Sequence, residues 1–372
     1  MFMKNWIIVA AFASAILAGC TKNEVRVDMP DQAISFTAAV GANSTKAMID
    51  GTEYPNDETF GTYAYYLPAG QNWAANAGDA KLYIPESLVK YTTAPSTPNY
   101  NWTTETPYYW PSAGSLTFFS FSPWSINDSV ECNTTDGIKI TGWDVDAKQT
   151  VDVMVADVAE DKTANETNPG GVGYNGVPTV FRHKLSQIVA FKFNTDKDYT
   201  NGNGDGTWDA GDKQIVVTGI SINSIATKGT FTSGPNTSGT ELGDWTGHDV
   251  DKSYTWYSDV TGGTTIIYDG TPSSYTTAVT PNHTPATNGH LLVLPQTFDD
   301  DAVIILNYTI KTYNGTDWVN DKVTKSIKLK DIHTEFEMNK KITYNFTIGL
   351  NQIYWAPSVV DWESESHDIS VR

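Results

Sequence analysis

The sequence predicts an all-β protein with two β-sandwich domains in tandem. Short apolar and aromatic runs alternate with turn residues along most of the 372-residue chain. No amphipathic run with helical spacing, of about 12 residues or more, separates them. Charged residues make up only 18% of the chain, while glycine and aromatic residues are abundant, as is typical of secreted β-rich proteins. A chain of this length corresponds to about two domains.

The chain is strongly acidic, with a formal net charge of −19 at pH 7. Nucleic acids and anionic lipid surfaces carry the same sign of charge and are repelled by such a protein. The composition therefore argues against a nucleic-acid-binding role.

Residues 1–19 have the features of a signal peptide. A short basic start precedes the apolar run Trp6–Leu17, which is too short to span a membrane. The run closes on Leu-Ala-Gly-Cys, which resembles a bacterial lipobox, so we expect acylation at Cys20 and a lipoprotein held on a membrane. The alternative is a plain signal peptide with a chance cysteine. With Cys20 lipidated, Cys132 has no partner for a disulfide within the chain.

The stretch from residue 33 to residue 47 has the pattern of a removable strand. Four apolar residues at alternate positions indicate a strand with one buried face: Ile34, Phe36, Ala38 and Val40. A soft turn follows, and the bond between Lys46 and Ala47 is one that a trypsin-like protease could cut. We interpret residues 20–46 as a lipidated tether with a detachable strand. The alternative, an ordinary first strand followed by a loop, stays open.

Two domains are expected after this segment, at 47–176 and 177–372, separated by the Asn- and Gly-rich junction Glu160–Val177. The strands expected in the first are Thr59–Leu67, Lys81–Ile84, Tyr108–Trp110, Ser115–Phe121, Gly137–Thr141 and Thr150–Ala156. Those in the second are Thr179–Phe193, Gln214–Ile222, Thr264–Tyr268, His290–Leu294, Ala302–Lys311, Lys322–Leu329, Ile342–Leu350 and a final segment, Ile353–Trp362.

One loop has the spacing of a Ca²⁺ site. Oxygen-bearing groups fall at the ligand positions of a calcium loop, with Gly206 at the turn: Asn201, Asn203, Asp205, Thr207, Asp209 and Asp212. Asn201 and Asp212 replace the stronger Asp and Glu ligands, which weakens the expected affinity. A structural Ca²⁺ ion is one interpretation, and a metal-free hairpin loop rich in Asn, Gly and Asp is the other. No cofactor is required by either.

The sequence gives no catalytic constellation. Its histidines are scattered, at positions 183, 248, 283, 290, 333 and 367, without a zinc-binding pair, and there is no Gly-x-Ser-x-Gly elbow. His183 is interpreted as structural, and the carboxylates of Asp299–Asp301 as solvated turn residues. We predict that the protein is not an enzyme.

Aromatic residues suggest a rival function, that of a surface glycan-binding lipoprotein. The candidates for a sugar-stacking platform are Trp102, Tyr108, Tyr109, Trp110 and Trp124. The alternative is that these side chains fill two large β cores.

Several segments, taken in order, resemble the fimbrillins of type V pili, including their Mfa-like branch. They are Asp152–Ala156, Phe181–Ser186, Leu294–Gln296, Asn339–Lys341 with Tyr344–Ile348, and Val360–Trp362, together with the lipobox, the Ile34–Phe36 strand and Thr45–Ala47. The resemblance covers the whole chain.

The resemblance implies a lipoprotein precursor with two transthyretin-like β-sandwich domains, exported to the outer membrane and the cell-surface fimbrium for adhesion. In such pilins a surface protease cuts after a basic residue, the N-terminal strand leaves, and its groove accepts a strand from another subunit. Lys46 matches the position of that cut, where the family's usual residue is Arg. A protease strict for Arg would spare Lys46 and leave an anchor or accessory subunit.

The expected donor of the replacing strand is the C-terminal tail. Ile353, Trp355 and Val359 share one face, Val360 and Trp362 the other, and Pro357 suits an edge or a bend. The alternative is that the tail is the last strand of its own sheet. Donation to another fimbrillin subunit is head-to-tail and does not close, so it would produce a filament.

Overall fold

The computed structural model describes residues 33–40, 54–93, 101–166, 176–199, 207–236, 238, 241–259, 261–268, 270–271, 274–283, 289–350 and 353–362. Over these residues the protein is almost entirely β, which confirms the predicted class. Helical geometry in the same ranges is confined to α1 (Trp73–Asn76) and the 3₁₀ turns η2 (Ala77–Asp79), η3 (Trp124–Ser129) and η5 (Leu329–Asp331).

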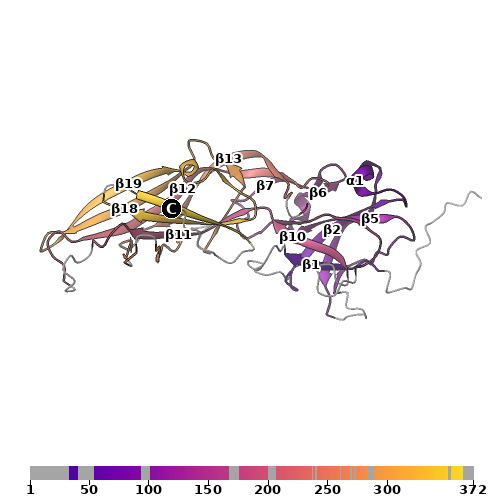
Figure 1. Cartoon of the computed structure of the whole chain (residues 1–372), viewed down its shortest axis with the longest axis horizontal. Coiled ribbons are helices and arrows are strands. Elements are labelled where there is room, and N and C mark those ends of the chain that lie inside the picture. The colour runs from indigo at the N-terminus through magenta and orange to yellow at the C-terminus, as the bar shows by residue number, and fades with distance from the viewer. Residues whose placement is uncertain are drawn as a thin grey trace, which may run out of the picture.

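One end of the molecule is built on an eight-stranded sheet (Figure 1). Its strands are β1 (Phe36–Val40), β2 (Thr59–Leu67), β3 (Lys81–Tyr91), β4 (Trp102–Thr104), β5 (Ser115–Ser122), β8 (Met154–Ala156), β9 (Ala159–Lys162) and β10 (Val177–His183). They pair in the order β2-β3-β4-β1-β10-β8-β5-β9, and β2 also pairs with β5. The second pairing closes seven of the strands into a ring around a buried cluster that includes Phe36, Phe60, Phe118 and Phe181.

The other end is a sandwich of two sheets. One contains β11 (Ser186–Thr195), β15 (Thr277–Ala278), β16 (Leu291–Val293), β21 (Lys340–Ile348) and β22 (Ile353–Asp361). The second contains β6 (Val130–Asn133), β7 (Gly137–Asp144), β12 (Lys213–Thr232), β13 (Asp244–Ser258), β14 (Thr264–Thr265), β18 (Val303–Tyr313) and β19 (Trp318–Lys328). The short strands β17 (Gln296–Thr297) and β20 (Glu335–Phe336) pair with each other.

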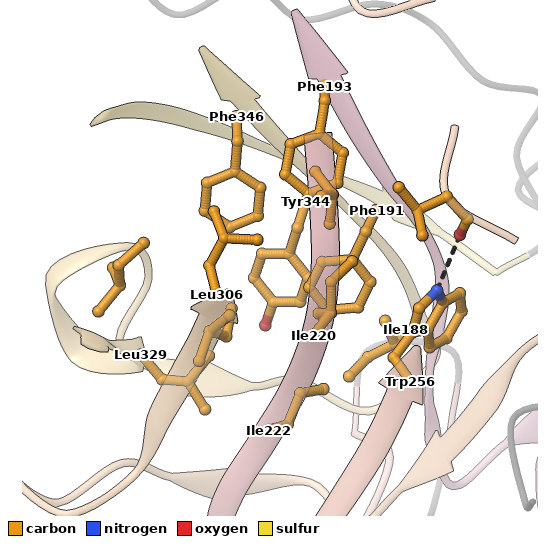
Figure 2. Close-up of a cluster of buried hydrophobic side chains, with 14 of the residues drawn as sticks. Ile188, Phe191, Phe193, Ile220, Ile222, Trp256, Leu306, Leu329, Tyr344 and Phe346 are labelled. Carbon is orange, nitrogen blue, oxygen red and sulfur yellow. Dashed lines mark hydrogen bonds between the residues drawn. The ribbon is translucent and has the colours of Figure 1, made fainter. Parts of the chain in front are cut away.

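Aromatic side chains hold the two sheets of the sandwich together (Figure 2). Within one sheet, Phe191 stacks on Tyr344 with ring centroids 5.1 Å apart, and Phe193 stacks on Phe346 at 5.4 Å. Across to the other sheet, the ring of Phe191 lies 5.1 Å from that of Trp256 on β13. The indole of Trp256 donates a 2.9 Å hydrogen bond to the Val279 carbonyl, so its polar edge is satisfied inside the core. Packing alone, with no disulfide among the described residues, supports this core.

The two ends share a sheet and a hydrophobic cluster. The 20-residue strand β12 runs from the sandwich toward the ring, where its last residues pair with β7. A central cluster combines the outer face of β2 and β5 with side chains of β7, β12 and β13, among them Phe119, Ile140, Phe231 and Trp245. Figure 1 shows β7 and β13 between the two ends.

The topology differs from the expected division at residue 177. Val177 begins β10, which pairs with β1 and β8 in the ring. After β6 and β7 have joined the sandwich sheet, the chain returns to the ring with β8 and β10, and it passes to the sandwich again between β10 and β11, through Lys184 and Leu185. The Asn- and Gly-rich stretch at 160–177 instead lies between β9 and β10, which belong to the same eight-stranded sheet, so it does not separate the two ends.

Two further expectations differ in detail. Tyr108–Trp110 is not a strand, and only an isolated bridge between Tyr109 and Ala33 forms there. The long strand β13 was not expected, because polar and charged residues interrupt its apolar ones.

Candidate functional site

The predicted removable strand is the buried strand β1. Ile34, Phe36 and Val40 are only 2%, 1% and 1% exposed, and Ala38 is half-buried on the same face. The ring of Phe36 meets Phe60 and Phe118 edge-on at centroid distances of 5.8 and 5.7 Å. The apolar face that the period-2 pattern predicts therefore points into the core of the ring.

β1 is bonded unequally to its two neighbours. It runs parallel to β10 over five residue pairs, from Phe36 opposite Val177 to Val40 opposite Phe181. Its pairing with β4 consists of one residue pair, Phe36 with Trp102. Loss of β1 would open the ring between β4 and β10 and leave the edge of β10 without a partner on that side.

The side-chain amide of Asn165 forms hydrogen bonds with the main chain just before β1. Asn165 Nδ2 donates a 2.7 Å hydrogen bond to the Ala33 carbonyl, and Asn165 Oδ1 accepts a 3.1 Å bond from the Ser35 amide. The same oxygen accepts a bond from the indole of Trp110 at 3.2 Å. The sequence gives no signal for this role of Asn165, because the residue lies in a stretch whose composition indicates only a loop.

A glycine lies against the backbone of β1. A Cβ placed on Gly176 would stand 2.6, 2.8 and 2.9 Å from three main-chain atoms of Phe36, which is closer than such contacts occur. Any other residue at 176 would push β1 away from β10. No sequence signal distinguishes this glycine from the others nearby.

The aromatic residues predicted as a sugar platform surround β1 or lie in the core. Trp102 is buried opposite the first residue of β1. The Tyr108 carbonyl accepts a 2.8 Å hydrogen bond from the Ile34 amide, and Tyr109 pairs with Ala33. Trp110 packs on the ring cluster and Trp124 on the central cluster. These side chains therefore do not form an open platform.

The predicted donor tail is strand β22, which pairs antiparallel with β21 over nine residues at the edge of the sandwich sheet. Tyr354 and Trp355 are 52% and 38% exposed. Ile353 and Val359 pack partly against the sandwich core. In this chain the tail is thus the last strand of its own sheet, and its donation to another subunit stays a prediction.

Trp362 fastens the end of the tail. Its side chain is fully buried in the central cluster and stacks on His183 with ring centroids 4.2 Å apart. Its amide donates a 2.8 Å hydrogen bond to the Asn339 carbonyl. His183 Nδ1 lies 2.7 Å from a carboxylate oxygen of Asp152. His183 belongs to β10, so a single strand touches both β1 and the end of the tail.

Half of the predicted Ca²⁺ ligands lie in the described part of the chain. Asp212 Oδ2 accepts a 2.8 Å hydrogen bond from the Asp209 amide, in a turn immediately before β12, and Thr207 precedes that turn. Asn201, Asn203 and Asp205 lie outside the described residues. Among those described, no group of three or more His, Cys, Asp or Glu side chains is placed to hold a metal ion. The Ca²⁺ site stays a prediction.

The lipidation and cleavage residues Cys20, Lys46 and Ala47 also lie outside the described residues. Within the described ranges no helix is long and apolar enough to cross a membrane. Cys132 is half-buried there, and burial raises the pKa of its thiol to about 12, so little thiolate forms near neutral pH.

Comparison with solved structures supports the fold. A fimbrial protein from Bacteroides vulgatus is similar with a TM-score of 0.54 and 17% identity, over 89% of this chain and 99% of that one. A candidate cell adhesion protein from Bacteroides uniformis gives 0.46 and 16% over 89% and 99%. The tip fimbrial protein Mfa3 from Porphyromonas gingivalis gives 0.34 and 9% over 87% and 99%. At these values only the first likeness bears on the argument, and it concerns the fold alone.

The curated proteins gave no match to this sequence. A family model described as fimbrillin-like matches residues 45–362, which is most of the chain. The protein therefore belongs to the fimbrillin-like family, whose members are structural and not catalytic.

Proposed function

We propose that this protein is a subunit of a cell-surface fimbria that acts in adhesion. It is exported as a lipoprotein anchored through Cys20 in the outer membrane, and proteolysis after Lys46 releases its N-terminal strand. The tail of a neighbouring subunit then fills the groove, so that subunits join head to tail. Membership of the fimbrillin-like family supports the general role.

The observation that carries the proposal is the attachment of β1. Its apolar face is buried, yet its pairing with β4 consists of a single residue pair, preceded by the Ala33–Tyr109 bridge with its hydrogen bond from the Ile34 amide to the Tyr108 carbonyl. Removing three large side chains from the core costs roughly 5–9 kcal/mol, at about 1.5–3 kcal/mol each. A strand held this way stays in place until a replacement with a similar apolar face arrives.

The tail is the segment best suited to be that replacement. It is an edge strand with exposed aromatic residues, and it pairs only with β21 among the strands of its five-stranded sheet. An edge strand can leave its sheet without breaking the pairings between the remaining strands. Cutting after Lys46 would end the covalent tie that keeps β1 close to its own groove, so that a tail from another subunit can compete.

The experiment is limited proteolysis of the mature protein with a trypsin-like enzyme, followed by gel electrophoresis without boiling. The expected result is a ladder of heat-sensitive oligomers that appears as residues 20–46 are lost. Lys46→Ala should abolish the ladder, and Lys46→Arg should retain it. A protein that stays monomeric after complete loss of residues 20–46 would contradict polymerisation.

A further inference from the structure

The groove of β1 holds its occupant largely by the main chain at its entrance. Four hydrogen bonds there involve backbone atoms of residues 33–35. Asn165 donates to the Ala33 carbonyl and accepts from the Ser35 amide. The Ile34 amide donates to the Tyr108 carbonyl, and the Val177 amide donates to the Ser35 carbonyl at 2.7 Å. Gly176 adds close contact with the backbone of Phe36. Because none of these contacts depends on the side chains at 33 and 35, another extended strand can make them.

We propose that Asn165 and Gly176 form a clamp that holds an extended strand in the groove by its main chain, while Pro357 of the incoming strand fixes the register. The inference rests on the proposed strand exchange, and it names the incoming segment as residues 353–359 of a second copy. Ile353, Trp355, Pro357 and Val359 of that copy take the places of Ile34, Phe36, Ala38 and Val40.

The hydrogen-bond pattern of β1 decides which positions tolerate proline. The bond from the Val177 amide to the Ser35 carbonyl, with Phe36 opposite Val177, sets the phase of the parallel ladder. In that phase the amides of Thr37 and Ala39 face β10, whereas those of Phe36 and Ala38 face the β4 side. β4 pairs with β1 only at Phe36. Proline is therefore excluded at 35, 37 and 39 and tolerated at 38.

Pro357 then fixes the register of the tail. If Tyr354 took the place of Ile34, Pro357 would fall at position 37, where the ladder needs an amide. If Trp355 took that place, Asp361 would fall at the buried position of Val40. With Ile353 at the place of Ile34, four apolar residues face the core and Pro357 falls at position 38. Residues 354, 356 and 358 then supply the amides that face the clamp and β10.

Two side chains of the incoming strand are larger than the β1 side chains that they replace. Trp355 is larger than Phe36, so the rings of Phe60 and Phe118, which touch Phe36, must shift. Pro357 is larger than Ala38, whose side chain is only half-buried.

The clamp is tested on the cut chain by the release of β1. After trypsin treatment, gel filtration and mass spectrometry measure how much of the 27–46 peptide remains bound with time. Loss of the two part-buried hydrogen bonds to the main chain in Asn165→Leu should speed release about 10-fold. Gly176→Ala should do the same by pushing the strand away. Release at the wild-type rate in both variants would overturn the clamp.

The chain offers matched controls for both substitutions. Asn282 makes the same two-way clasp on the main chain of Ser258, at 3.0 and 2.8 Å, in the sandwich. Gly78 has open space around the position of its Cβ. Asn282→Leu and Gly78→Ala should leave release unchanged. Faster release in Asn282→Leu as well would assign the effect of Asn165→Leu to general destabilisation and overturn the clamp.

The register is tested by cross-linking between copies. In a Cys132→Ser background, Val180→Cys marks the residue of β10 opposite Ala39, whose place Ser358 takes in the proposed register. A cut copy with this change, mixed with a copy that carries Ser358→Cys and keeps Pro357, should form a disulfide-linked dimer, whereas a copy with Val359→Cys should not. Preferential linkage to residue 359 would overturn the register.

These outcomes separate the inference from the function on which it rests. If Asn165→Leu speeds release but no polymer forms with wild-type protein, the clamp stands as a device for holding β1 and the exchange fails. If wild-type protein polymerises while the variants and cross-links behave as the controls, the function stands and the clamp fails.

Discussion

At the scale of single residues, His333 is a polar side chain held among aromatic ones. Its Nδ1 lies 2.8 Å from the Glu335 carbonyl and its Nε2 lies 2.8 Å from the Tyr344 hydroxyl. The ring of Phe298 meets it edge-on at 5.1 Å. Burial among these groups lowers the pKa of His333 below its ordinary value of 6.5, because the charged form is poorly solvated there.

This lowered pKa gives stability a pH dependence. The unfolded chain binds a proton at His333 at a higher pH than the folded chain does, so the contribution is present above pH 6.5 and is lost as pH falls below it. We expect the free energy of unfolding, measured with urea, to decrease between pH 7 and pH 5.

The variant His333→Gln should show a shallower decrease over that range. Burial also lowers the pKa of His290, whose contribution has the same sign and remains in the variant. An equally steep decrease in wild type and variant would show that His333 does not contribute.

At the scale of elements, the tail strand β22 is held at one end far more firmly than along its length. Its middle residues are partly exposed, while Trp362, just beyond its end, is fully buried against His183. The C-terminal end of β22 is therefore anchored by a buried side chain, whereas the side chains along the strand are more accessible to solvent.

Replacing the buried end should loosen the strand. Trp362→Ala removes a fully buried aromatic side chain, and we expect a loss of about 3–5 kcal/mol in unfolding free energy. Hydrogen exchange should also become faster along β22. Tyr354→Ala, at a position 52% exposed, is the control and should cost about 0.5 kcal/mol or less. Equal effects of the two changes would contradict a fixed end.

Local patterns predicted the strands that alternate strongly. The segment Thr59–Leu67 coincides with β2, and the apolar face of Ile34, Phe36 and Val40 is buried as the period of two indicates. The closed ring and the passage of β10 into it were not predicted, because pairing between distant strands leaves no local periodicity. For the same reason Asn165 was missed, since it contacts Ser35 across 130 residues of sequence.

At the scale of the whole molecule, the predicted Ca²⁺ loop precedes β12, the strand that the two ends share. If the loop binds Ca²⁺, the folded state alone gains that binding energy, and the melting temperature should rise with added Ca²⁺ and fall with a chelator. Asp209→Asn and Asp212→Asn should each weaken the response. A melting temperature that is the same in Ca²⁺ and in chelator would contradict the site.

The length of β12 also has a mechanical consequence. It is bonded on one side to β18 and then β7, and on the other to β14 and β13. In a fibre of such subunits, a pull along the axis would load these backbone bonds in shear, many at once, instead of unzipping them one by one. The joint between the halves would then be as resistant to stretching as the halves themselves.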